Sequence, residues 1–320
     1  MITIECYSVL QQYFPGYRGM FKQMRLSCEF KIQMKKPFLL IFAILSLTSC
    51  EKRLLTGLPQ DADRPVLNVL MNENAPLKAR FTLSGRLAEG QSFKDPENAE
   101  TKLYENDVFK ESLKPRTIDG TKYYLSTIGV LKDKKYRVTA AAPGFSPIEG
   151  SDIIPDISTI EINNQAVIES NIDQYKLKFN FLLKNTSKEK QYYRFRILYE
   201  ENNSGKTIKK TPFYIRPVNT PDIFGNGNSS KKEWFVEKAQ PAGETIFYAF
   251  STDDKPASKH RYIEVTLLTE TSYKYLKSVA KAEDSNNSLF AEKVIIHSNI
   301  QNGLGIVGGL SYKEFPIPNP

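Results

Sequence analysis

The residue with the clearest chemistry in this sequence is Cys50, and the segment before it indicates what becomes of its thiol. Met34-Lys35-Lys36 is a short basic start, residues 38–47 form an almost unbroken apolar run, and Leu47-Thr48-Ser49-Cys50 closes that run. This order is typical of a bacterial secretion signal (residues 34–49) that ends in a lipobox. The apolar run has about half of the ~20 residues that a membrane-spanning helix needs. The sequence therefore predicts that diacylglycerol is attached to the Cys50 sulfur, that the chain is cut before Cys50, and that acyl chains hold the mature protein on a membrane.

Nucleophilic catalysis has few residues to draw on. The sequence contains two histidines, His260 and His297, and Cys50 is the one cysteine expected in the mature chain. With Cys50 acylated, neither a Cys/His nucleophile pair nor a zinc site of His and Cys can be built. A Ser/His/Asp triad has only two candidate bases. We therefore expect no catalytic histidine, no metal and no cofactor.

Carboxylate chemistry is less constrained. The pairs Asp61/Asp63 and Asp253/Asp254 lack the graded ligand spacing of a calcium loop, so we interpret them as solvated turns. A hydrolase of the glycosidase type needs two acids, which can come from distant strands, and the sequence leaves this alternative open.

One glycine-rich stretch matches the letters of a dinucleotide-binding fingerprint. Gly303-Leu304-Gly305-Ile306-Val307-Gly308 has the required spacing, but a fingerprint needs a following helix whose amino terminus receives the pyrophosphate. The residues that follow include Pro316 and Pro318, which block a helix. We therefore predict no nucleotide site and interpret the stretch as a connection between strands at Lys293–Ser298 and Leu310–Phe315.

The elements that must position these residues are mainly strands. Between residues 65 and 156, about seven short strand candidates alternate with turns, among them a hairpin around Glu105-Asn106-Asp107 and a turn at Ala142–Phe145. This spacing is typical of an immunoglobulin-like or transthyretin-like β-sandwich. Residues 50–64, with Gly57 and Pro59, are predicted to form a polar tether in front of it.

Residues 157–320 are predicted to form a second, larger antiparallel β domain. Apolar residues alternate along its strands, so each strand has one buried face and one solvent-facing side that carries Lys and Arg; the clearest runs are Leu177, Phe179, Phe181 and Leu183, and Tyr193, Phe195, Ile197 and Tyr199. Together with the first sandwich, this predicts an all-β fold of two β-sandwich-like domains with one helix.

That helix is expected at about residues 271–283. Tyr273, Leu276 and Ala280 share one face, and Thr269 or Thr271 can cap its start. The long segment Arg216–Lys232 is predicted to be a loop, and loops of this length inside a domain often carry function.

Composition limits the partners. The chain has a net charge of +8, and residues 1–49 supply six Lys or Arg and two Glu, so the mature chain has a charge of about +4. Its basic residues are interspersed with acidic ones, which argues against a nucleic-acid face.

Residues 1–33 precede the secretion signal, and we interpret them as a mis-assigned start with translation from Met34, which would remove Cys6 and Cys28.

Several segments resemble one known family. They are the lipobox, Ala99–Val108, Ala142–Phe145, Tyr273–Leu276 and, most specifically, His297–Ile306. In these the sequence resembles the Bacteroidota lipoproteins called domain of unknown function 4249 over essentially the whole mature chain. Many members have Phe-Gly where this chain has Val307-Gly308. The resemblance implies a β-rich outer-membrane lipoprotein, often found alongside TonB-dependent transporters, with no established activity and no catalytic residues to transfer.

The functional hypothesis is a non-enzymatic, lipid-anchored protein of the outer membrane, facing the surface or the periplasm, that is a binding or accessory partner of a TonB-dependent transporter. The candidate interaction surface combines the C-terminal motif and the long loop: Asn299, Asn302, Gly303, Leu304, Gly305, Ile306, Asp222 and Phe224. Two alternatives remain, a carboxylate-based hydrolase of surface glycans or peptides and a structural or adhesive spacer. The oligomeric state is left open.

Overall fold

The computed structural model describes residues 63–84, 93–171, 174–185, 187, 189–201, 209–218, 230–238, 245–253, 260–286 and 294–318. Its elements in chain order are β1 (Pro65–Asn72), β2 (Pro76–Leu83), β3 (Glu100–Glu105), β4 (Val108–Ser112), β5 (Lys114–Ile118), β6 (Thr121–Gly129), β7 (Lys135–Ala141), β8 (Ile148–Ile153), the 3-10 helix η1 (Ile157–Thr159), β9 (Ile160–Asn171), β10 (Gln174–Asn185), β11 (Gln191–Glu201), β12 (Lys209–Pro212), β13 (Arg216–Pro217), β14 (Trp234–Lys238), β15 (Thr245–Thr252), β16 (Arg261–Leu268), α2 (Glu270–Asn286) and β17 (Leu304–Ile317).

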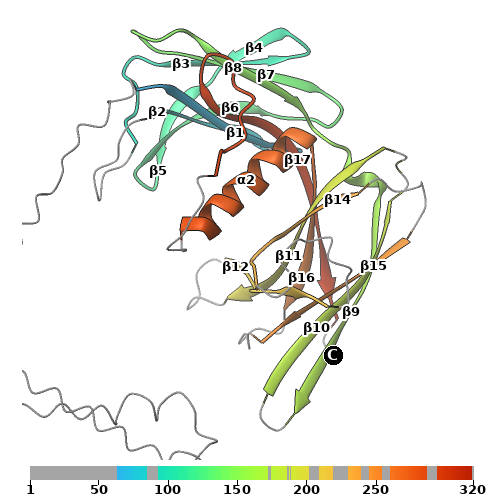
Figure 1. Ribbon diagram of the computed structural model, residues 1–320. Helices are drawn as coiled ribbons and strands as arrows, with labels where there is room; N and C mark the ends of the chain where they lie inside the picture. The colour runs from blue at the N-terminus through green and yellow to red at the C-terminus, as the bar shows by residue number, and fades with distance from the viewer. Residues whose placement is uncertain are drawn as a thin grey trace, which may run out of the picture. The chain divides into compact units, whose positions relative to one another are not determined.

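The predicted β-rich fold with one helix is confirmed for the described residues (Figure 1). The strands form three sheets. Sheet A has the order β12-β11-β16-β17-β1-β2-β6-β5, with β14 also paired to β11; sheet B has the order β4-β3-β7-β8, and sheet C the order β13-β15-β10-β9.

The first core lies between sheet B and the β1, β2 and β6 part of sheet A. Alternate residues of these strands, such as Leu67, Phe81, Tyr124 and Val138, are almost fully buried in one cluster. The predicted hairpin joins β3 to β4. Its turn residues Asn106 and Asp107 both have positive φ, which matches the twist of the flanking strands.

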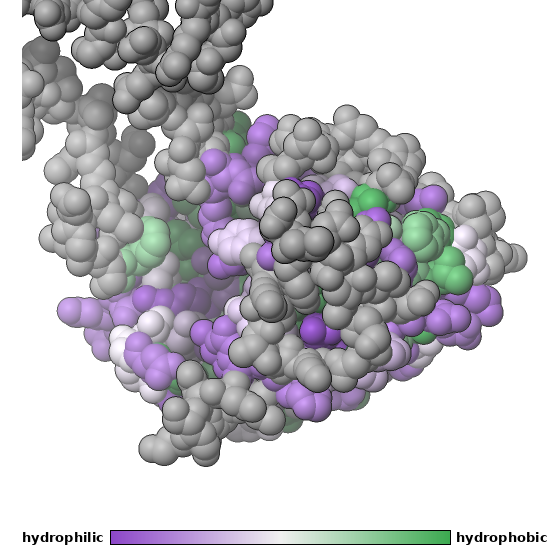
Figure 2. Space-filling model, turned by 90° about the horizontal axis from the view of Figure 1, so that it is seen from below, coloured by the Kyte–Doolittle hydropathy of each residue, from purple (hydrophilic) through white to green (hydrophobic). Residues whose placement is uncertain are grey.

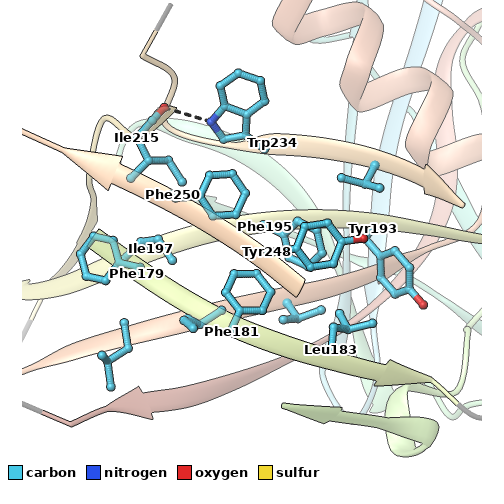
Figure 3. Packing of buried hydrophobic residues seen from close by; sticks show 14 of the residues in the cluster. Phe179, Phe181, Leu183, Tyr193, Phe195, Ile197, Ile215, Trp234, Tyr248 and Phe250 are labelled. Carbon is cyan, nitrogen blue, oxygen red and sulfur yellow. Dashed lines mark hydrogen bonds between the residues drawn. The ribbon is translucent and has the colours of Figure 1, made fainter. Parts of the chain in front are cut away.

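The second core lies between sheet C and the β11 and β16 part of sheet A (Figure 3). The alternation predicted for β10 and β11 is observed, and every second residue of each strand points into this core. Phe181 of β10 contacts the rings of Phe195, Tyr248 and Phe250 with centroid distances of 5.4, 5.3 and 6.0 Å. Aromatic pairs at such distances add to the stability gained by burial.

β17 takes part in both halves of sheet A. Its residues 304–310 pair in parallel with β1, and its residues 310–317 pair antiparallel with β16. The domain boundary placed at residue 156 stays a prediction, although sheet A contains strands from both sides of it. The predicted last strand was too short, because the glycine-rich stretch forms the first half of β17. The predicted strand before it is wrong for residues 294–298, which are not in a strand.

The predicted helix is observed as α2, slightly longer than expected. Thr269 caps its start, since the Thr269 hydroxyl accepts a hydrogen bond from Ser272 N at 3.2 Å. Tyr273 packs against Tyr192 of β11 and Leu268 of β16, which fixes the helix on the face of sheet A that points away from sheet C. No helix among the described residues is long and apolar enough to cross a membrane.

Candidate functional site

The side-chain amide of Asn299 forms hydrogen bonds with the backbone of β17, as a paired strand would. Its Oδ1 accepts a hydrogen bond from Val307 N at 2.9 Å, and its Nδ2 donates to Val307 O at 2.8 Å and to Ser151 O of β8 at 3.2 Å. The amide therefore satisfies backbone groups that would otherwise lack a partner. Asn299 thus holds β8 and β17 together.

The next residues of the motif lie against the first residues of β8. The backbone of Gln301 exchanges two hydrogen bonds with Glu149 of β8, at 2.8 and 3.4 Å. Ile300 is buried in the first core, and its Cδ1 would lie 2.6 Å from a Cβ at Gly150. Asn302 has a positive φ of 57°, and its Nδ2 donates to Pro147 O at 3.4 Å. This part of the motif is therefore a turn that packs against β8 and is hydrogen-bonded to it.

Two glycines of the motif permit close approach of other chain segments. Gly305 has a φ of 110°, and a Cβ there would collide with the carbonyl oxygen of Leu67 in β1. At Gly303 a Cβ would lie 2.8 Å from Ile148 Cγ2 and 2.9 Å from Pro65 O. A side chain at either position would push β17 away from β1.

Asp152 joins three elements just beyond this motif. Its Oδ2 accepts hydrogen bonds from Gly309 N of β17, at 2.9 Å, and from the hydroxyl of Thr269, the cap of α2. Burial raises the pKa of Asp152, although these hydrogen bonds favour the ionised form. The carboxylate therefore ties β8, β17 and the start of α2 to one point.

The structure brings most of the predicted interaction residues together, namely Asn299, Asn302, Gly303, Leu304, Gly305 and Ile306. Ile306 is fully buried and Leu304 partly buried. Asp222 and Phe224 lie outside the described residues. The contacts above give the motif a role inside the protein, and its role toward a partner stays a prediction.

Replacing Asn299 by Ala should destabilise the protein by about 2–3 kcal/mol, because Val307 and Ser151 would lose hydrogen-bond partners in a poorly solvated place. Urea denaturation of purified variants measures this loss. Asn302→Gly is the matched control: the bond from Asn302 to Pro147 O is long and exposed, and glycine adopts the positive φ of this position readily, so we expect a loss under about 1 kcal/mol. Equal stability of Asn299→Ala and the parent protein would contradict the structural role.

A second cluster of polar side chains lies on the face of sheet A that points away from sheet C. Glu264 of β16 accepts two hydrogen bonds from Arg196 of β11, Nε to Oε1 at 2.8 Å and Nη2 to Oε2 at 2.5 Å. Arg194 Nη2 lies 3.3 Å from Glu264 Oε1, and Arg194 Nη1 lies 3.5 Å from Glu233 Oε2. Thr266 donates to Glu264 Oε1 at 3.1 Å. The cluster thus balances two cations with two carboxylates.

The two carboxylates differ in electrostatics. Burial raises the pKa of Glu233 against the opposing charges of Arg194 and Arg196. Burial acts on Glu264 in the same direction, but the hydrogen bonds and charge of Arg196 and the charge of Arg194 outweigh it, and the pKa of Glu264 lies below its ordinary value. The Glu264 side chain is only 3% exposed. Glu264 is therefore an ionised carboxylate that is buried and held by the two arginines.

Sequence reasoning missed this cluster. The alternation along β11 assigns Arg194 and Arg196 to a solvent-facing side, and nothing in their spacing shows that this side is covered. The signal that existed was the single Glu264 within the apolar run of β16. Its significance depends on the register that sets Glu264 opposite Arg196 and Thr266 opposite Arg194.

Only part of the acidic pairs that we interpreted as solvated turns lies among the described residues. Among the described residues, no group of three or more His, Cys, Asp or Glu is placed to hold a metal ion. Asp253 is paired with Arg216, whereas Asp61 and Asp254 lie outside the described residues. The exposed large apolar residues come from several separate strands and loops. Figure 2 likewise shows a largely hydrophilic face with small hydrophobic areas.

Comparison with known proteins gives one family. The model described as "Domain of unknown function (DUF4249)" matches residues 52–315. No curated protein gives a significant match.

Several solved structures share a distant likeness. A DUF4785 family protein from Legionella pneumophila is 13% identical, with 64% of this chain and 50% of that chain covered and a TM-score of 0.22. Salmonella alpha-2-macroglobulin mutant Y1175G is 9% identical, with 83% and 16% covered and a TM-score of 0.25. Escherichia coli alpha-2-macroglobulin activated by porcine elastase is 10% identical, with 80% and 22% covered and a TM-score of 0.22. The chain thus spans half or less of each of these proteins, and they carry no argument about its function.

Proposed function

The chain belongs to the family described as domain of unknown function DUF4249, and from this premise we propose that it is a lipid-anchored binding protein of the outer membrane. In this proposal it is a non-enzymatic accessory partner of a TonB-dependent transporter. The observation that carries the anchor is the segment from Met34 to Cys50, with its basic start, short apolar core and lipobox. The proposal that the partner is a TonB-dependent transporter rests on the family resemblance of the C-terminal motif.

The geometry of the buried carboxylates Glu233 and Glu264 counts against hydrolysis by this pair. A hydrolase of the glycosidase type needs one acid that can donate a proton and one carboxylate that can reach the substrate or its water. Glu264 is bound by Arg196 on both oxygens and is almost fully buried. Glu233 contacts Arg194, which also contacts Glu264. The arginines that hold this pair leave Glu264 without access to a glycan or peptide.

The lipid anchor predicts a clear labelling result. Cells that express the protein and are fed radiolabelled palmitate should incorporate label into it, and Cys50→Ala should abolish that labelling and release the protein from membranes. Ser46→Ala is the matched control, because it changes a residue of the predicted signal but keeps Cys50 and Leu47-Thr48-Ser49 before it. Label that persists in Cys50→Ala would contradict acylation at this residue.

The partner can be sought by affinity purification. The tagged, lipidated protein is purified from gently solubilised outer membrane, and the proteins that accompany it are identified by mass spectrometry. We expect a TonB-dependent transporter in near-equal amount with the lipidated protein and much less with Cys50→Ala, since the anchor concentrates both on one surface. Recovery of the lipidated protein alone would count against the accessory role.

A further inference from the structure

Arg261 is a buried arginine that forms no ion pair among the described residues. The residue is 7% exposed, and its Nε and Nη1 have no hydrogen-bond partner among the described residues. By contrast, the nearby Arg196 has two bonds to Glu264. Two of the three guanidinium nitrogens are thus buried without a hydrogen bond, which is costly, and a bound anion would offset that cost.

The position of Arg261 in β16 separates it from the carboxylates of the charged cluster. Arg261, Ile263 and Val265 share the face of β16 that points toward sheet C, whereas Glu264 points to the opposite face. Arg261 lies opposite Tyr199 of β11 and Ile317 of β17. Arg261 therefore stands at the end of the second core, with an aromatic and an aliphatic residue as its neighbours in the sheet.

Two further polar atoms near these strands lack partners. Thr211 of β12 lies opposite Tyr199, and its Oγ1 is buried without a hydrogen bond among the described residues. Asn164 of β9 donates from Nδ2 to Pro316 O at 3.2 Å, and its Oδ1 is likewise buried and without a partner there. Pro316 precedes Ile317, the residue opposite Arg261. Three strands thus bring unsatisfied groups to the same end of the core.

We propose that Arg261 is the centre of a binding site for an organic carboxylate with an apolar body. A planar guanidinium matches a carboxylate in shape and charge, and one cation calls for one negative charge. Thr211 would donate a further hydrogen bond, and Asn164 would accept one from a ligand hydroxyl. Tyr199 and Ile317 would contact the apolar part. This site does not depend on the proposed membrane partner.

Thermal unfolding in the presence of sodium octanoate tests the site. The full chain with Cys50→Ala, which removes the expected lipid, is heated with octanoate and, separately, with sodium phosphate. Octanoate at about ten times its Kd should raise Tm by about 3–5 °C, and phosphate should raise it much less. Arg261→Met should lose the octanoate shift. Arg116→Met, at an exposed position of β5, should keep it.

Three outcomes would overturn the proposal. They are an unchanged octanoate shift in Arg261→Met, an equal shift with phosphate, and the absence of any shift in the parent chain. Should Arg261→Met fail to fold, Arg261→Lys keeps the charge but loses the planar group, and its affinity for octanoate should fall about tenfold. Native mass spectrometry then compares bound octanoate in the two proteins, and equal occupancy in Arg261→Lys would contradict the site.

Discussion

Gly309→Ala should prevent stable folding. The added Cβ would collide with the carbonyl oxygen of Ile153, which is backbone and cannot turn aside as a side chain can. Because β17 is central in sheet A, relief requires moving β17 or β8, and β8 is held by Asp152 and Asn299. Overpacking a rigid core costs about 1–3 kcal/mol, and a clash with backbone exceeds that range. Soluble yield and urea denaturation measure the loss.

Gly129→Ala provides the matched control for this prediction. Gly129 ends β6, and a Cβ there would lie 3.5 Å from the carbonyl group of Asn74, an ordinary van der Waals distance. We expect a change within about 1 kcal/mol in either direction. Comparable solubility and stability of Gly309→Ala and Gly129→Ala would show that the approach of β8 to β17 is looser than described.

Glu264→Ala has the second large effect, a loss of about 3–5 kcal/mol. The reason is that two buried cations would lose a counter-charge: Arg194 and Arg196 would face each other with Glu233 as their remaining carboxylate in the cluster. The measurement is the free energy of unfolding from chemical denaturation at pH 7. Glu161→Ala is the control, because its ion pair with Lys184 is largely exposed and should contribute about 0–1 kcal/mol.

A double-mutant cycle distinguishes the buried pair from simple loss of packing. Glu264→Leu with Arg196→Met replaces both charges by apolar groups of similar size. The double variant should be more stable than the sum of the two single losses implies, because each single change leaves an uncompensated charge. Additive losses would show that the two side chains do not interact.

The pH dependence of this effect follows from the lowered pKa of Glu264. The stabilisation from its ionised form is fully present above the ordinary glutamate pKa of about 4.3, and it is lost as the pH falls through the lower pKa of the folded state. The difference in stability between the parent protein and Glu264→Ala should therefore shrink under acid conditions. A difference that stays constant down to strongly acid pH would contradict an ionised Glu264.

Local patterns in the sequence were sufficient for much of the fold. Alternation in β10 and β11, the Asn106-Asp107 turn and the face of α2 each reflect interactions between near neighbours along the chain, and the structure has all of them. The glycine-rich stretch was misplaced for a physical reason. Glycine weakens a strand in general, but in β17 it permits the approach of Leu67 and Ile153, which are distant in sequence.

The candidate site was less accessible to sequence reasoning. Asn299 was selected because it belongs to the family motif, and its bonds to Val307 and Ser151 depend on the position of β8. The burial of Arg261 and Glu264 likewise depends on the register of β11, β16 and β17. One sequence contains no direct record of such pairings between distant strands.

The parallel pairing of β1 with β17 also determines the order in which the chain can become native. β1 is among the first parts of the described chain to be synthesised, and residues 304–310, which complete its second edge, are among the last. Until they arrive, β1 has β2 as its one sheet neighbour and presents an open strand edge that can pair wrongly. Contacts of such high sequence separation slow folding. A chain arrested before β17 should therefore keep this open edge, and neither core is complete until Val307 and Ile317 of β17 are in place.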